Sequence, residues 1–179
     1  MSIPLQVPET VTFEQAIALT ESLLSQAQAG DKEPEIAAVI AQLVKTESGA
    51  RGFFVTYLTS DMSVADNPST EVVQALRSSP EVVAELLVKN LAMSASQTVF
   101  HRRNQKEEMA LGSERVHKRT ARLIERVELP SVYDRCLKLL ESATTGEGSY
   151  KAFLERWGYD AQQRQVISEA LQQVISERK

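Results

Sequence analysis

The sequence is short of cysteine, glycine and proline, and each shortage excludes a kind of structure. A single cysteine, Cys136, cannot form an intrachain disulfide, so nothing in the chain requires an oxidising compartment. Seven glycines, six prolines and few runs of β-branched residues among 179 residues favour helices. The N-terminal segment MSIPLQVPET has neither a positively charged part nor an apolar part, so we expect no secretory signal.

A membrane-spanning segment is also missing. Only residues 82–100 are apolar enough to suggest one, and Glu85 and Lys89 lie inside this run. A charge at the centre of a bilayer costs about 2.5 to 3.5 kcal/mol, so the run predicts a buried helix and no membrane insertion. The formal net charge of -4 also argues against a protein whose whole surface binds nucleic acid.

What the sequence does have is the composition of a globular, cytoplasmic protein. Its residues are 42% hydrophobic and 25% charged, and a chain of 179 residues is long enough to bury a core. We predict an extended N-terminal tail over residues 1–11 and a helical core domain over 12–143. A C-terminal helical pair over 149–179 is expected to pack on the same domain.

Signals for the start of a helix recur along the chain and predict an all-α fold. Thr12 with Gln15, and Asp160 with Gln163, have the spacing of capping boxes, and Asp31 is a third predicted N-cap. These signals, with the apolar spacing between them, predict about eight helices and no strand. We expect the helices to pack, in an orthogonal or bundle-like arrangement, around a central apolar helix over residues 80–111.

Residues 50–58 are ambiguous, because their Phe, Val, Tyr and Thr residues favour a strand. Their apolar side chains nevertheless recur at helical spacing, and no second strand is available to pair with them. We therefore predict a short helix, in which Gly52 costs about 1 kcal/mol relative to alanine. Gly49 is predicted to end the preceding helix, and Asn67 to begin the following one.

The central apolar stretch continues without interruption into residues 101–126. An unbroken helix from Pro80 to Val127 would be about 72 Å long, whereas a compact chain of this length has a radius of gyration of about 16 Å. We therefore predict that the helix breaks at Gly112 and Ser113, where glycine would end one helix and serine would cap the next.

Residues 101–126 are also the most basic part of the chain. They hold eight Lys or Arg against four Glu, a net charge of +4, so the remaining residues together carry -8. Arg115, Arg119, Arg122 and Arg126 recur at helical spacing beside Lys118, and we call these five residues the basic stripe. The candidate residues for binding a partner or an anion are Arg102, Arg103, Arg115, Lys118, Arg119, Arg122 and Arg126.

Three interpretations of the basic stripe stay open. It is a solvated face whose charges pair with the acidic remainder of the chain or of a second subunit, a surface for an acidic protein partner, or a contact for nucleic acid. Against nucleic acid, no aromatic residue is interleaved for base stacking, and no DNA-binding or RNA-binding motif is present.

No catalytic or metal-binding set of residues can be identified. Glu114 and His117 have the Glu-x-x-His spacing of di-iron bundles, but the only other histidine, His101, lacks a glutamate at that spacing. His101, with Arg102 and Arg103, could line a pocket between helices, which keeps a small-molecule or metal-binding enzyme as an alternative. We predict no cofactor, no metal site and no catalytic residue.

Three phrases of the sequence, GARGFFVTYLTSD, ELLVKNLAMS and HRRNQ, resemble an uncharacterised all-helical protein family found in cyanobacteria. The resemblance extends over about residues 40–160. It implies a bacterial cytoplasmic protein and carries no activity, cofactor or catalytic residue.

The leading hypothesis from the sequence is a non-enzymatic, cytoplasmic interaction protein, either an adaptor or a structural protein. It would use the basic stripe to bind an acidic protein partner or a second copy of itself as a homodimer. A nucleic-acid-binding module that uses the same stripe is the first alternative, and an enzyme with a pocket near His101 is the second.

Overall fold

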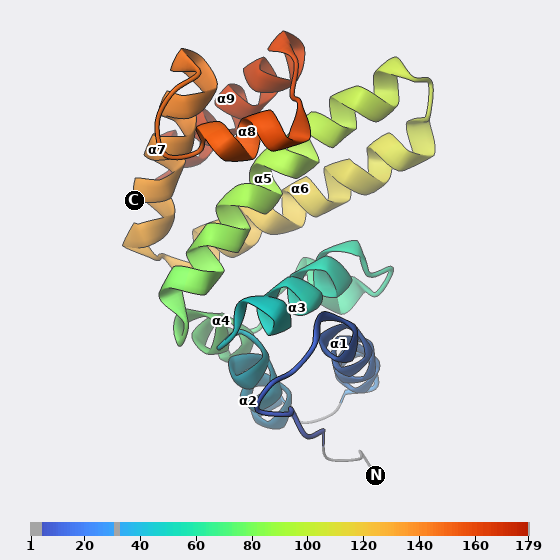
Figure 1. Cartoon of the computed structure of the whole chain (residues 1–179). Coiled ribbons are helices and arrows are strands. Elements are labelled where there is room, and N and C mark those ends of the chain that lie inside the picture. Colours follow the sequence, from blue (N-terminus) through green and yellow to red (C-terminus); the bar gives the residue numbers. More distant parts are fainter. Residues whose placement is uncertain (1–4, 31–32, 179) are drawn as a thin grey trace. The chain divides into compact units, whose positions relative to one another are not determined.

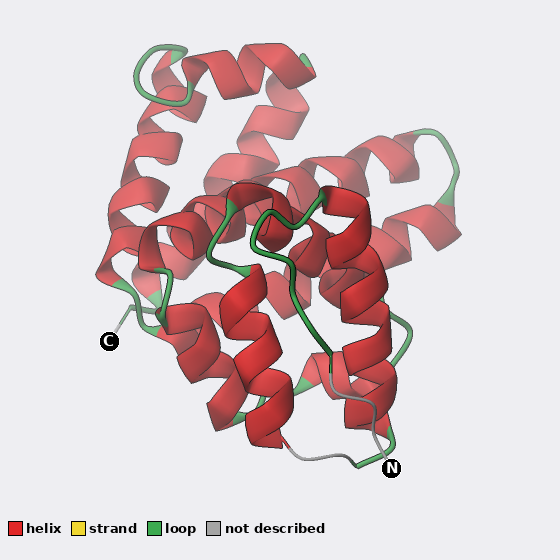
Figure 2. Ribbon diagram, turned by 60° about the horizontal axis from the view of Figure 1, so that its bottom comes forward, coloured by secondary structure: helices red, strands yellow, loops and turns green. Residues whose placement is uncertain are grey.

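A computed structural model describes residues 5–30 and 33–178, and these ranges contain helices, turns and loops but no strand (Figures 1 and 2). Of the residues in these ranges 79% are helical, which confirms the predicted all-α fold. The helices of the described residues are α1 Phe13–Gln28, α2 Glu33–Leu43, α3 Glu47–Thr59, the 3-10 helix η1 Ser63–Asp66, α4 Thr70–Arg77, α5 Pro80–Arg103, α6 Glu107–Val127, α7 Pro130–Thr145, α8 Lys151–Trp157 and α9 Ala161–Ser176. No helix among them is long and apolar enough to cross a membrane.

The chain forms two compact units. The first covers residues 1–86 and contains α1 to α4 with the start of α5, and the second covers residues 87–179 and contains the rest of α5 with α6 to α9. The division predicted from the sequence, into a tail, a core domain and a C-terminal pair, stays a prediction. Part of the predicted tail, and the predicted N-cap Asp31, lie outside the described residues.

In the first unit, α1 and α3 lie side by side (Figure 1). The predicted capping box begins α1, with the Gln15 amide donating to the Thr12 hydroxyl at 3.1 Å and the Thr12 amide donating to the Gln15 side chain at 2.9 Å. Gly52 marks the close approach of the two helices, because a Cβ atom there would lie 2.5 Å from the Cβ of Ala16 and 2.7 Å from the Phe13 carbonyl oxygen. The two backbones pack this closely only because Gly52 has no side chain.

Residues 50–58 are helical within α3, as predicted, but the predicted boundaries around them were wrong. Gly49 does not end α2, because Thr46 caps α3 by accepting the Gly49 amide on its hydroxyl at 3.1 Å, which places Gly49 in the first turn of α3. Ser69 caps α4 in the same way, so Asn67 is not its first residue. A nearby hydroxyl therefore decided each helix start.

The second unit contains a helical hairpin formed by α5 and α6, which corrects the predicted break at Gly112 and Ser113. The central helix ends at Arg103 and not at residue 111, and the turn lies at residues 104–106. Gln105 has a left-handed backbone with φ of 59°, and the Asn104 side chain donates to the Phe100 carbonyl at 2.7 Å. Gly112 instead lies inside α6 with open space around it. The role of α5 as a central axis stays a prediction.

The remaining helices of the second unit build a packed core. The helices α7 and α9 lie side by side, and α8 contacts α7. The side chains of Cys136 and Leu139 on α7, Leu154 on α8, and Ile167 and Leu171 on α9 are all fully buried. Burial raises the pKa of the Cys136 thiol to about 12, so this cysteine is a packing residue and not a reactive thiolate.

Candidate functional site

The two arginines at the end of α5 point to different partners. Arg102 bonds to carboxylates of α6, whereas Arg103 bonds to residues at the start of α9. Consecutive residues on a helix are separated by about 100° around its axis, so neighbouring side chains reach different elements. The pair thus joins α5 to two other helices of the second unit.

Arg102 uses three of its nitrogens in ion pairs with α6. Its Nε and Nη2 donate to the two carboxylate oxygens of Glu107 at 3.1 and 3.0 Å, and its Nη1 donates to Glu114 at 3.1 Å. This is the fork arrangement that makes arginine-carboxylate pairs geometrically specific. The hydrogen bonds raise the pKa of Arg102 and lower the pKa of Glu107. Glu114, which has the Glu-x-x-His spacing with His117, is thus a partner of Arg102.

Arg103 bonds to two residues at the start of α9, just after the turn that follows α8. Its Nη1 donates to Oδ2 of Asp160 at 2.8 Å and to the Gln162 side chain at 3.0 Å. The other oxygen of Asp160 accepts the Gln163 amide at 2.9 Å and completes the predicted capping box of α9. That cap first, and Arg103 second, lower the pKa of Asp160. The carboxylate of Asp160 therefore serves two structural purposes at once.

The basic stripe follows one side of α6, but its five members differ in exposure. Lys118, Arg122 and Arg126 are exposed, Arg115 is half-buried, and Arg119 is only 4% exposed. Arg119 lies at the edge of the stripe next to the buried face, because the buried Leu123 follows it by four residues on the same side of the helix. The exposed cations are thus concentrated in the second half of α6.

His117 lies on α6, is half-buried and faces α5. Its Nδ1 is 3.4 Å from the hydroxyl of Ser94, and the Leu91 carbonyl also faces its ring. Burial lowers the pKa of His117, with the Leu91 carbonyl acting in the opposite direction. The Ser94 hydroxyl also lies 2.7 Å from the Asn90 carbonyl oxygen and 3.1 Å from the Leu91 carbonyl oxygen, so these carbonyls compete with His117 for its single proton.

The structure gives the predicted pocket residue His101 a partly buried environment at the end of α5. Its Nδ1 atom is buried and has no hydrogen-bond partner among the described residues. No group of three or more His, Cys, Asp or Glu side chains in that part of the chain is placed to hold a metal ion. His101, Arg102 and Arg103 do not converge on one another, because both arginines are directed to other helices.

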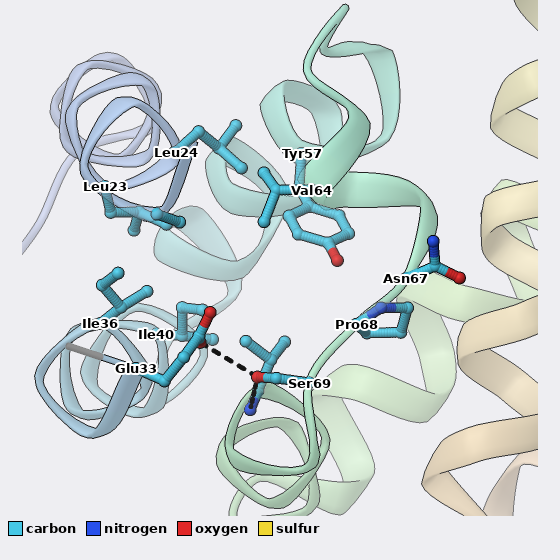
Figure 3. Close-up of a pocket in the computed structure, with 12 residues that line it drawn as sticks. Leu23, Leu24, Glu33, Ile36, Ile40, Tyr57, Val64, Asn67, Pro68 and Ser69 are labelled. Atoms are coloured by element: carbon cyan, nitrogen blue, oxygen red, sulfur yellow. Dashed lines mark hydrogen bonds between the residues drawn. The ribbon is translucent and has the colours of Figure 1, made fainter. Parts of the chain in front are cut away.

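A hollow in the first unit lies among α1, α2, α3 and the segment before α4 (Figure 3). Aliphatic side chains surround it, and the Ser69 hydroxyl at its rim donates to the Glu33 carboxylate at 3.0 Å. Its volume is about 20 Å³, close to what one water molecule requires. The hollow is therefore too small for an organic ligand.

A larger cleft of about 260 Å³ lies in the second unit, where the end of α6 and the start of α7 meet the end of α9. Glu125, Glu128 and Glu177 give it an acidic wall, and the Arg178 guanidinium lies 4.6 Å from the centre of the Tyr133 ring. The sequence analysis missed this cleft, because its residues lie about 50 positions apart and form no local motif.

The fold and these contacts define an all-helical protein whose polar surface features are built from charged side chains on α5, α6, α7 and α9. Residues 12–174 match the family described as "Uncharacterised conserved protein UCP020893", and the chain belongs to this family. No curated protein and no solved structure matches the chain. Membership in an uncharacterised family agrees with the resemblance stated above, whereas a cyanobacterial origin stays a prediction.

Proposed function

We propose that the protein is a non-enzymatic, cytoplasmic interaction protein that binds an acidic protein partner, or a second copy of itself, through the basic stripe. One observation carries this proposal. The exposed cations Lys118, Arg122 and Arg126 share α6 with the fully buried Leu123 and Val127. Because the buried face of α6 packs in the core, the exposed cations are held at a fixed spacing along the helix. Less conformational entropy is then lost when a partner binds them.

The charge distribution supports an acidic partner. Residues 101–126 have a net charge of +4 while the rest of the chain has -8, so a second copy carries enough negative charge to be that partner. Arg122 and Arg126 also have interactions within the chain, and the proposal does not require them to be unpaired. A partner with several carboxylates would compete with those interactions.

The experiment compares two charge-reversal variants for binding to fluorescein-labelled poly-L-glutamate at about 50 mM salt. K118E/R122E changes two exposed residues of the stripe, and K138E changes an exposed lysine on α7 as a control. We expect the wild type and K138E to bind and K118E/R122E to lose at least about ten-fold in affinity, as expected for two lost charge contacts. Thermal unfolding of each variant verifies that the helices remain folded. Absence of binding by the wild type, or equal binding by both variants, would overturn the proposal.

Nucleic-acid binding through the same stripe is the alternative that the exposed cations of α6 also favour. A phosphate-driven contact loses affinity steeply as salt rises. Glu107 and Glu114 lie in α6 and pair with Arg102. Their negative charges reduce the positive potential at the start of α6. A duplex DNA titrated under the same conditions decides between the two, because preference for DNA over poly-L-glutamate by a factor of ten or more would favour this alternative.

An enzyme with a pocket near His101 is the second alternative. The observation in its favour is the buried Nδ1 atom of His101, which has no hydrogen-bond partner among the described residues. Its metal version is tested by elemental analysis of the purified protein. Stoichiometric iron, manganese or zinc would support the metal-binding version. Absence of all three metals from the purified protein would rule it out.

A further inference from the structure

We propose that Glu107 and Glu114 are built-in competitors for Arg102, and that they lower the affinity of the basic side of the α5-α6 hairpin for an acidic protein segment. This inference rests on the function proposed above and adds a form of regulation to it. The partner must exchange its own carboxylate for that of Glu107 before Arg102 contributes to binding.

The first step of the argument is the geometry at Arg102. A guanidinium can donate paired hydrogen bonds to a carboxylate from either of two edges. In Arg102 the edge formed by Nε and Nη2 already donates to both carboxylate oxygens of Glu107. Glu114 takes Nη1. An incoming carboxylate needs the same paired donors, so it cannot form this contact while Glu107 remains in place.

The second step is that this exchange is feasible. The side chains of Arg102, Glu107 and Glu114 are 46%, 60% and 36% exposed, so water and a partner reach all three. Ion pairs at such exposure are weak and easily replaced. The N-cap residue of α6, Lys106, makes no side-chain capping hydrogen bond, and the Glu107 carboxylate bonds to Arg102, so the Glu107 side chain can turn away without breaking a cap.

The third step is the contrast with Arg103. Its partner Asp160 caps α9 with one oxygen while it binds Arg103 with the other. Displacing Asp160 would therefore disturb the start of a helix, whereas displacing Glu107 would not. Of the two adjacent arginines, only Arg102 is available for exchange.

The fourth step links Arg102 to the basic stripe. Its partner Glu114 precedes Lys118 of the stripe by four residues, so Arg102 is bound one helical turn before Lys118 on the same side of α6. A freed Arg102 would thus extend the stripe at its N-terminal end and add a further point of contact for an extended acidic segment. Glu107 and Glu114 therefore determine whether Arg102 adds to the basic surface that a partner contacts.

The test measures the affinity for labelled poly-L-glutamate at about 50 mM salt in E107Q and in the matched control E108Q. Both variants remove one carboxylate from the first turn of α6, but Glu108 is exposed and makes no ion pair in the described part of the chain. We expect E107Q to bind about three- to five-fold more tightly than E108Q, the fold-change of one exposed ion pair. R102A/E107Q is expected to return to the affinity of E108Q, and E107Q/E114Q to exceed E107Q.

Equal affinities of E107Q and E108Q would overturn the inference, because only net charge would then matter, while the proposed function would stand. Tight binding by R102A/E107Q would overturn it as well. Failure of both the wild type and E107Q to bind poly-L-glutamate would overturn the inference together with the proposed function. Tighter binding of duplex DNA alone by E107Q would show a nucleic acid, and not an acidic protein, as the competing ligand.

Discussion

At the scale of single residues, the two helical glycines Gly52 and Gly112 have opposite roles. Gly52 lies where α1 and α3 approach most closely, whereas Gly112 has open space around it inside α6. Both look alike in the sequence, where each is a glycine within a helical pattern. Only the crossing of α1 and α3 distinguishes them.

We predict that Gly52→Ala destabilises the protein by about 1 to 3 kcal/mol, because its Cβ would overlap Ala16 and the backbone of α1. Gly112→Ala, as the matched control, should stabilise it by about 0.5 to 1 kcal/mol, because alanine has the higher helix propensity. Urea unfolding of both variants measures the two changes. A neutral Gly52→Ala would show that α1 and α3 do not pack as closely as described.

The partial burial of His117 predicts that the free energy of unfolding decreases as the pH falls. Its pKa is lowered in the folded state, so the unfolded chain binds more protons as the pH falls below about 6.5. The contribution of His117 to stability is therefore present above that pH and is lost as the pH falls towards the pKa of the folded state.

Unfolding free energies at pH 7.5 and 5.5 measure this effect. We expect the difference between the two pH values to shrink in His117→Gln and to persist in His101→Gln, which changes the other histidine. An unchanged difference in His117→Gln would contradict the burial of His117 between α5 and α6.

At the scale of elements, helix ends with local signals were predictable from the sequence and those with tertiary causes were not. The capping boxes of α1 and α9 each lie within four consecutive residues, so the spacing of those residues was enough to predict them. The turn after α5 depends on a left-handed Gln105, a residue that carries no turn signal, while Gly112 offered a misleading one. Glycine permits a break, but it does not impose one.

The candidate site shows the same division. Periodicity placed the basic stripe on one side of α6, and Lys118 and Arg122 are exposed there. It could not show that Arg119 is buried or that Arg103 meets Asp160, which lies 57 residues further along the chain. Contacts of that separation depend on the packing of whole helices.

The double use of Asp160 predicts a graded response to mutation. Asp160→Asn keeps a capping oxygen for α9 but loses the charge that faces Arg103, so it should lower the thermal midpoint slightly. Asp160→Ala loses both contacts and should lower it further, whereas Arg103→Ala should resemble Asp160→Asn. An alanine variant no less stable than the asparagine variant would show that Asp160 does not cap α9.

At the scale of the whole molecule, the separation of charge along the chain predicts salt-sensitive self-association. If a second copy is the acidic partner, sedimentation velocity should show dimer at about 50 mM salt and monomer at about 500 mM, because exposed charges are screened. K118E/R122E should remain monomeric at both. A dimer that is insensitive to salt would contradict an association driven by the basic stripe.

The central claim is that exposed cations of α6 bind an acidic protein segment, and one measurement tests it most directly. This is the affinity of K118E/R122E for labelled poly-L-glutamate relative to that of K138E, at the same salt and with both variants folded. We predict a loss of at least about ten-fold in the stripe variant and little change in the control. Equal affinities of the two variants would contradict the claim.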